Sequence, residues 1–332
     1  MTNLVLTEPQ VAAERMVVLE ERRMRTDNDP GAGLEEEAQA VRYFNHPYRR
    51  PVIGWESEVA TLTSSEALDF YRHWYAPNNA VVVVAGDVTP DEVRSLAEHS
   101  YGLIPRADVP KRLELQEPPQ RADRRVALTD ARVRQPALTR SWPAPSYRYG
   151  AAVHAYPLQV LEEILGGGAT SRLYRKLVVE QALAVSADAS YGPSQRGPAT
   201  VVISASPRPG VTLERLEQAV AGIVREIVDS GVTDEEVERA KRRMLADAVY
   251  ARDSYSTAAR IIGEALAIGQ TVDDVEAWPD RIGAVTRRQV EEAARLVLDQ
   301  PTVTALLVAG NGAAVTDAAA ARPVAPDGAA IR

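Results

Sequence analysis

Two carboxylates near the start of the chain have the type and spacing needed to share a ligand. Glu14 and Glu21 are the first and last residues of the segment ERMVVLEE and lie seven residues apart. In a helix with 3.6 residues per turn this spacing puts both side chains on one face. Two carboxylates on one face repel each other unless a cation, a proton or a basic neighbour lies between them. Arg25, four residues after Glu21, offers the alternative of a surface ion pair.

The elements that would position these carboxylates begin with a helix from about Glu8 to Arg25. Its candidate buried side consists of Val11, Val17, Val18 and Met24. The segment DNDPGAG should break this helix, because Asp, Asn, Pro and Gly favour turns. A second short helix is expected near LEEEAQAVRYF, followed by an extended loop over NHPYRRPVIGWESEVATL.

Helix-start signals then recur along the chain. Thr63 and Glu66 have capping-box spacing at the start of TSSEALDFYRHWY, and Thr89 and Glu92 repeat it in TPDEVRSLAEHSYG. Between these two predicted helices, NNAVVVVAGDV is a short β-branched apolar run, which predicts a buried strand.

A Pro-rich, charged and aperiodic stretch, LIPRADVPKRLELQEPPQRADRR, predicts a linker between domains. Beyond it, strands are expected at RRVALTD, RQPALTRSW, LAVSADASYG, ATVVISASP and TVTALLVAG. Helices are expected at AVHAYPLQVLEEILGGG, at SRLYRKLVVEQ and over most of residues 213–298. We therefore divide the chain into residues 1–108, a linker at 109–123, a second domain at 124–310, and a disordered tail at 311–332 rich in Ala, Pro and Gly.

Two stretches of about two dozen residues match each other. Residues 63–86 contain a predicted helix, a Pro-containing turn and an apolar run ending in VVVAG, and residues 286–310 repeat this pattern up to LLVAG. The match indicates two related domains rather than a solenoid. The first would be incomplete, by on the order of 100 residues, if both domains had the same length. Such a domain should expose apolar surface, so we expect aggregation or dimerisation of the chain on its own.

Composition narrows the classes of function. The chain has 332 residues, 45% of them hydrophobic and 25% charged, as in soluble globular proteins. A net charge of −8 argues against nucleic acid or an anionic membrane as partner. Cysteine is absent, which excludes disulfides and thiolate metal sites. No apolar run approaches the roughly 20 residues of a transmembrane helix. The opening MTNLVLTEPQ lacks the features of a signal peptide, and the compartment stays unassigned.

ERMVVLEE, the segment HPYRRPVIGWESEVATLTSSEALDFYRHWYAPNNAVVVVAGDV and GGGATSRLYRKL together resemble the pitrilysin/insulinase family of zinc metallopeptidases. The likeness is greatest to its bacterial branch, which is similar to the mitochondrial processing peptidase. It covers the chain from about Glu8 to Gly310, with the motifs in the same order. The resemblance implies an α+β fold of two homologous sheet-and-helix domains, the first of which is incomplete here.

The resemblance also implies a zinc site. In this family two histidines and a catalytic glutamate come from an H-x-x-E-H helix, and a later glutamate is the third ligand. Matched residue by residue, Glu21 falls on that ligand and Glu14 on a glutamate that supports the site from behind. Histidine nitrogens with a carboxylate oxygen suit catalytic zinc, whose bound water attacks the peptide carbonyl.

This sequence departs from the family pattern at two places. Its histidines are His46, His73, His99 and His154, and no two of them have H-x-x-E-H spacing. Family members that complete the active site from the second domain carry an arginine and a tyrosine in L-R-x-x-x-x-L-x-Y. Here Val178 and Val185 occupy those positions, and neither side chain can donate a hydrogen bond to an oxyanion. Zinc is therefore expected in the parent family, while occupancy in this chain alone is not.

The resulting hypothesis is a chain of a peptide-hydrolysing zinc endopeptidase with a clamshell chamber, inactive by itself. Its partners would be a peptide substrate and a second chain of the family that supplies the arginine and the tyrosine. The alternative is a non-catalytic subunit or peptide-binding scaffold of a heterodimeric peptidase. The glycine loop GGGATSR, residues 166–172, lacks the Walker lysine and follows a predicted helix rather than a strand. It therefore indicates a joint between helices near the substrate chamber rather than a phosphate site.

Overall fold

The computed structural model describes residues 1–251 and 254–310. Its carboxyl-terminal region, residues 124–310, is built on one sheet with the strand order β1-β5-β2-β4-β3. The strands are β1 (Arg124–Asp130), β2 (Ala137–Ala144), β3 (Ala184–Tyr191), β4 (Ala199–Pro207) and β5 (Val303–Ala309). β1 and β5 pair in parallel, while the other neighbouring strands are antiparallel. These five strands confirm the predicted ones in this half of the chain.

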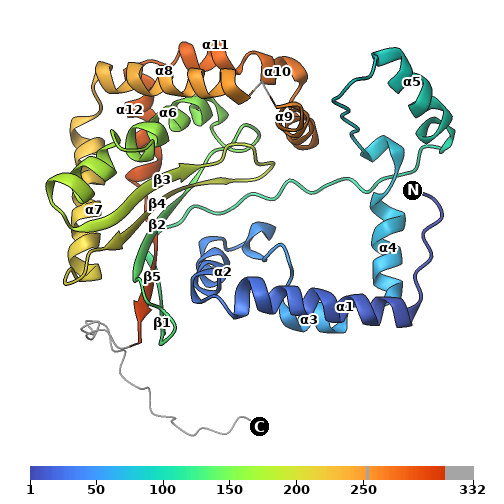
Figure 1. The fold of residues 1–332 in the computed structure, drawn as a ribbon, viewed down its shortest axis with the longest axis horizontal. Coiled ribbons are helices and arrows are strands. Elements are labelled where there is room, and N and C mark those ends of the chain that lie inside the picture. Colours follow the sequence, from blue (N-terminus) through green and yellow to red (C-terminus); the bar gives the residue numbers. More distant parts are fainter. Residues whose placement is uncertain (252–253, 311–332) are drawn as a thin grey trace, which may run out of the picture.

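Helices cover one face of this sheet (Figure 1). They are α6 (Ala155–Gly166), α7 (Leu213–Ser230), α8 (Asp234–Ala251) and α12 (Arg287–Leu298). The remaining helices are α9 (Tyr255–Ile268), α10 (Val272–Glu276) and α11 (Trp278–Gly283). They follow α8 in the chain and lie toward one end of the helical layer (Figure 1). The main hydrophobic core lies between this helical layer and the sheet, around fully buried side chains such as Trp142, Leu216 and Leu306. The α+β fold is therefore as the sequence indicates.

The glycine-rich segment after α6 is a helix–loop–helix joint held close to the sheet. A Cβ on Gly166 would collide with the backbone of Ala189 in β3, so glycine permits this contact. The segment leads into the π-helical Tyr174–Glu180. Arg172, the last residue of GGGATSR, is buried and binds Glu236 of α8 with two hydrogen bonds of 2.6 and 2.7 Å. Contacts with β3 and with α8 therefore hold this loop in place.

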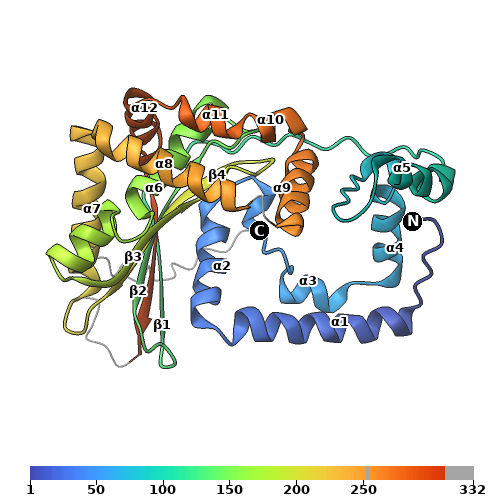
Figure 2. The same ribbon diagram turned by 45° about the horizontal axis from the view of Figure 1, so that its top comes forward.

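The amino-terminal region, residues 1–108, consists of helices without a sheet (Figure 2). They are α1 (Glu8–Arg22), α2 (Pro30–Arg42), α3 (Glu56–Thr61), α4 (Ser64–Trp74) and α5 (Pro90–His99). α1 runs alongside α3, and neither α3, α4 nor α5 contains a buried residue. Of the predicted buried side of the first helix, Val11 is buried and Val18 is half-buried. Val17 is exposed, and so is Met24, which lies in the π-helical turn Arg23–Asp27 after α1.

The strand predicted at NNAVVVVAGDV does not form. Residues 80–85 adopt no strand pairing, and Val81, Val82 and Val84 are half or more exposed. The prediction was wrong because a β-branched run becomes a strand only when a neighbouring strand accepts its backbone hydrogen bonds. Among the described residues, the only sheet is the one in the carboxyl-terminal region.

α2 is the amino-terminal helix that does pack against a sheet. Leu34 and Ala38 of α2 contact Ala305 of β5, on the face opposite to the main core. At its end, Arg42 donates to the hydroxyl of Ser141 in β2 across 3.2 Å. The short helix and the loop after it therefore connect the amino-terminal region to the sheet of the carboxyl-terminal region.

Candidate functional site

The two carboxylates of ERMVVLEE lie on α1 as predicted from their spacing, but their surroundings differ. The helix begins after Thr7, which forms a capping box with Gln10. Glu14 is exposed. The side chain of Glu21 is 38% exposed, and its carboxylate lies 2.9 Å from the guanidinium of Arg25. The alternative of a surface ion pair with Arg25 is thus present in the structure.

Glu21 borders a hollow of about 500 Å³ between α1, α2 and the loop at residues 51–53. Two further carboxylates, those of Glu35 and Glu36 in α2, line the same hollow. Each has its own arginine, since Glu35 binds Arg42 at 3.0 Å and Glu36 binds Arg22 through two hydrogen bonds of 2.7 Å. Glu21 differs from them in its partner, because Arg25 is exposed whereas Arg42 and Arg22 are buried, and an exposed pair contributes little.

The described residues do not fit a complete zinc site. Within residues 1–251 and 254–310, no group of three or more His, Cys, Asp or Glu side chains is arranged to hold a metal ion. The ring of His73 contacts the carbonyl of Asp69, and that of His99 contacts the carbonyl of Ser95, each within its own helix. Catalytic zinc takes three protein ligands, of which the position of Glu21 could supply one. We derive no catalytic step through zinc from these residues.

Val178 and Val185 lie in different environments. Val178 is buried in the main core within the π-helical segment Tyr174–Glu180, whereas Val185 on β3 is 46% exposed. β3 is an edge strand of the sheet. Both side chains are apolar and can only contribute contacts by packing.

A second polar cluster, which sequence reasoning did not single out, joins the two regions. The carboxylate of Glu117, in the linker, accepts hydrogen bonds from three successive backbone N–H groups, those of Phe44, Asn45 and His46, at 2.5 to 3.0 Å. The backbone N–H of Glu117 in turn donates to the hydroxyl of Tyr149 at 2.8 Å. Three convergent amides form a strong carboxylate site. The linker is therefore bound to both regions at once.

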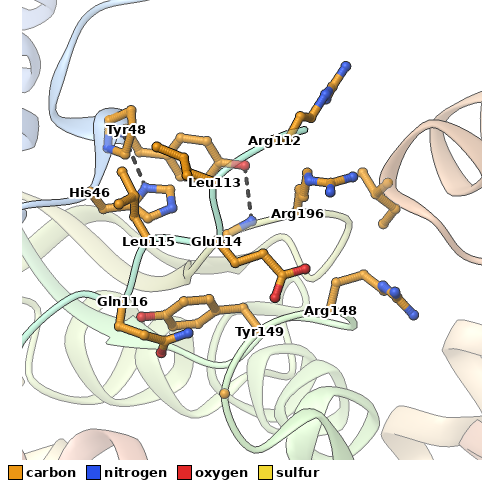
Figure 3. Close-up of a pocket in the computed structure, with 14 residues that line it drawn as sticks. His46, Tyr48, Arg112, Leu113, Glu114, Leu115, Gln116, Arg148, Tyr149 and Arg196 are labelled. Atoms are coloured by element: carbon orange, nitrogen blue, oxygen red, sulfur yellow. Dashed lines mark hydrogen bonds between the residues drawn. The ribbon is translucent and has the colours of Figure 1, made fainter. Parts of the chain in front are cut away.

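His46 and Tyr48 belong to the same contact between the two regions, which we call the Glu117 joint (Figure 3). His46 is 8% exposed, and its Nδ1 accepts a hydrogen bond from the Tyr48 backbone N–H at 3.3 Å. Burial lowers the pKa of His46, although the charge of Glu117 opposes the shift. A neutral ring is what this acceptor role requires. The Tyr48 hydroxyl accepts from the Gly197 N–H at 3.2 Å. These contacts give His46 a structural role at this joint.

The same joint encloses a pocket of about 250 Å³ (Figure 3). Arg112, Arg148 and Arg196 line it together with one carboxylate, that of Glu114. Arg112 lies over the ring of Trp74, and Arg148 lies beside Gly269 at the carboxyl end of α9, where a cation is favoured. Two of the three arginines thus have structural contacts. No local pattern in the sequence predicts this joint, because Tyr48, Glu117 and Gly197 come from three distant loops.

Comparison with known proteins agrees with this architecture. The profile described as "Peptidase M16 inactive domain" matches residues 61–244, more than half of the chain. A zinc protease of Helicobacter pylori, PqqE, is 27% identical over 268 residues, which cover 80% of this chain and 60% of that protein. An uncharacterized zinc protease of Mycobacterium leprae is 30% identical over 308 residues, covering 90% of this chain and 66% of that protein. The chain thus spans about 60% of the length of the first of these relatives.

Solved structures show the same fold. A protease from Helicobacter pylori superposes with a TM-score of 0.84 at 24% identity, covering 92% of this chain and 73% of that one. The first half of the periplasmic protease PqqL from Escherichia coli gives a TM-score of 0.75 at 16% identity, covering 93% and 68%. Sheet, helical layer and family profile define a peptidase-type α+β protein. The chain belongs to the peptidase M16 family, whose relatives include named zinc proteases.

None of the helices in the described residues is long and apolar enough to cross a membrane.

Proposed function

We propose that this chain contributes to a zinc metallopeptidase of the M16 family, with Glu21 as one of the three zinc ligands. The observation that carries the proposal is the position of Glu21. It lies on a capped helix, beside a hollow of about 500 Å³, and among the described residues it forms an ion pair with the exposed Arg25. A carboxylate held only by a surface pair is available to a metal ion, because such a pair contributes about 0 to 1 kcal/mol.

The rest of the site would come from other polypeptide. Two histidines and a catalytic glutamate would have to approach Glu21 on an H-x-x-E-H helix. The exposed Val81, Val82 and Val84 lie in a segment without strand pairing, which could become a strand if additional sheet formed beside it. In this proposal residues 1–108 and 124–310 are parts of two related domains, joined by residues 109–123, and together they form part of a chamber for a peptide. A second chain of the family would supply an arginine and a tyrosine, which Val178 and Val185 cannot replace.

The test is a mixing experiment. The chain is combined with a segment of a longer relative that carries H-x-x-E-H. Bound zinc is measured by metal analysis after dialysis, and hydrolysis is followed with a quenched fluorogenic peptide. Zinc binding and hydrolysis should appear in the mixture and disappear in the Glu21→Gln variant or with a chelator. The matched control is Glu20→Gln on the same helix, which removes an exposed pair with Arg23 and should change neither signal.

Two results would separate the readings. Hydrolysis that survives chelation or the Glu21→Gln substitution would rule out a zinc role for Glu21. A mixture that binds peptide without zinc and without hydrolysis would favour the second candidate, a non-catalytic subunit. One observation favours this candidate. The apolar Val178 and Val185 stand at the positions where other family members carry the arginine and the tyrosine.

A further inference from the structure

A cavity of about 680 Å³ lies in the carboxyl-terminal region. It shares no lining residue with the hollow at Glu21, and α9 lies between it and the pocket of the Glu117 joint, which Ile268 of α9 also lines. The walls of the cavity come from α9, α10 and α11, with Ala258, Ile262 and Val275 among the apolar side chains that line it. The aromatic rings of Tyr147, Tyr156 and Trp278 also border it. The size falls within the range of sites that bind small molecules or side chains, which are mostly apolar with a few fixed polar groups.

The aromatic side of the cavity is held rigid by hydrogen bonds. The amide of Gln159 donates to the hydroxyl of Tyr147 at 3.0 Å and accepts from the indole N–H of Trp278 at 3.0 Å. The rings of Tyr147 and Tyr156 lie 5.2 Å apart. Burial also raises the pKa of Tyr147, so its hydroxyl stays protonated at neutral pH. These aromatic surfaces are therefore preformed rather than adaptable.

The opposite wall, α9, is an apolar helix with little packing against the rest of the protein. Ala265 is its one buried residue, and Ile261 is 38% exposed. Among the described elements it packs mainly against the short helix α10, and its Gly263 lies beside the side chain of Val83. An amphipathic helix normally covers its apolar face with core side chains. Here that face borders the cavity, so a ligand in the cavity would bury apolar surface on both walls.

The charged side chains that line the cavity should favour some apolar ligands over others. The charged side chains that line it in the described part of the chain are Glu264, Asp274 and Glu276, all of them acidic. Asp274 is paired with Arg281 at 2.8 Å and Glu264 with Arg260 at 3.2 Å, whereas Glu276 is exposed at the rim. An acidic group on a ligand would meet only carboxylates among these lining residues, which costs affinity through like-charge repulsion.

We propose that this cavity binds an aromatic or branched aliphatic side chain of a peptide, with a basic residue next to it directed at Glu276. The inference rests on the proposed role in peptide hydrolysis, since it names the class of peptide that the chain selects. Its test needs no zinc and no partner, so that its failure can be told apart from failure of the proposed role for Glu21.

Binding is followed through the fluorescence of Trp278, with the Trp278→Phe variant defining the signal from the other tryptophans. Three blocked pentapeptides are compared, with the central pairs Phe-Lys, Phe-Glu and Gly-Lys. The Phe-Lys peptide should bind at least tenfold more tightly than either of the others. Equal binding of the Phe-Glu peptide, or no change in Trp278 emission with any peptide, would overturn the proposal.

Matched variants locate the binding. Ala258→Trp places a large side chain on the α9 wall of the cavity and should weaken binding of the Phe-Lys peptide at least tenfold. Ala267→Trp adds the same side chain at an exposed position of α9 outside the cavity and should leave binding within twofold. If Ala258→Trp does not fold, Glu276→Gln at the exposed rim still decides, because it should reduce the preference for Phe-Lys over Phe-Glu about threefold. An unchanged preference would contradict the proposal.

Discussion

Residues 63–86 and residues 286–310 have similar sequences but different structures. Each begins with a threonine capping box, at Thr63 for α4 and at Thr286 for α12. α12 buries five residues against the core and leads into β5, which pairs with strands on both sides. α4 buries none, and the valines after it stay exposed and unpaired. Capping and helix formation are therefore local properties, while burial and strand formation depend on the neighbours that each stretch has.

The largest expected difference between the regions concerns two buried arginines. Arg172 in the carboxyl-terminal region is 9% exposed and binds both oxygens of Glu236, as well as the carbonyl of Gly231. Although burial raises the pKa of Glu236, the guanidinium and the Thr233 N–H lower it to about 2. Arg172→Ala would leave that carboxylate buried and unpaired, so we expect a loss of about 3–5 kcal/mol in the free energy of unfolding. Urea denaturation measures it.

Arg22 is the matched control in the amino-terminal region. It is 6% exposed and also forms two hydrogen bonds with a carboxylate, that of Glu36. Arg22→Ala should release α1 from α2 and increase hydrogen exchange in α1, with less than half the effect on the main unfolding transition. An equal loss in both variants would show that the two regions unfold as one cooperative unit.

Shortening one side chain in each of the two related apolar runs, VVVAG and LLVAG, tests whether burial differs between them as the structure shows. Leu306 in β5 is fully buried, so Leu306→Ala should cost about 2–5 kcal/mol in the free energy of unfolding. Val82 at the corresponding run is 62% exposed, so Val82→Ala should stay within about 0.5 kcal/mol. Thermal melting of both variants is the measurement. A large effect at Val82 would mean that the run is packed in solution, for instance between two copies of the chain.

A smaller effect is expected from a carboxylate of the helical layer. Burial, and then the nearby charge of Glu163, raise the pKa of Glu162 to about 7 against the favourable charge of Arg243. Between pH 4.5 and about 7 the folded state therefore binds more protons at this site than the unfolded state, and stability falls as the pH rises. Because the group is partly screened by solvent, we expect Glu162→Gln to stabilise the protein at pH 8 by roughly 1–2 kcal/mol.

Melting temperatures from pH 5 to pH 8 test this expectation. The difference in stability between the Glu162→Gln variant and the parent should grow across this range and level off above pH 7. A constant difference over the whole range would mean that the carboxyl of Glu162 titrates alike in the folded and unfolded states.

Much of the carboxyl-terminal region was predictable because its signals are local. Alternating residues in β3 and β4 and the apolar run of β5 predicted strands, and these strands have neighbours within the same chain. The same reasoning failed at Val81 to Val84 and at the exposed face of α1, where packing partners decide the outcome. Glu21 was identified through the resemblance to a family and not through any pattern of ligands. The joint at Glu117 and the cavity beside α9 depend on distant loops and on an uncovered helix face, for which the sequence contains no periodic signal.

The position of α2 has a consequence for cutting the chain. The linker at residues 109–123 is exposed over much of its length and is a natural site for a protease. However, residues 30–48 hold the sheet through Leu34, Ala38 and Arg42, and they lie before that linker. A nick between residues 109 and 115 should therefore yield two fragments that elute together until denaturant is added. A fragment made to begin at residue 124 would leave an apolar patch on β1 and β5 open to water.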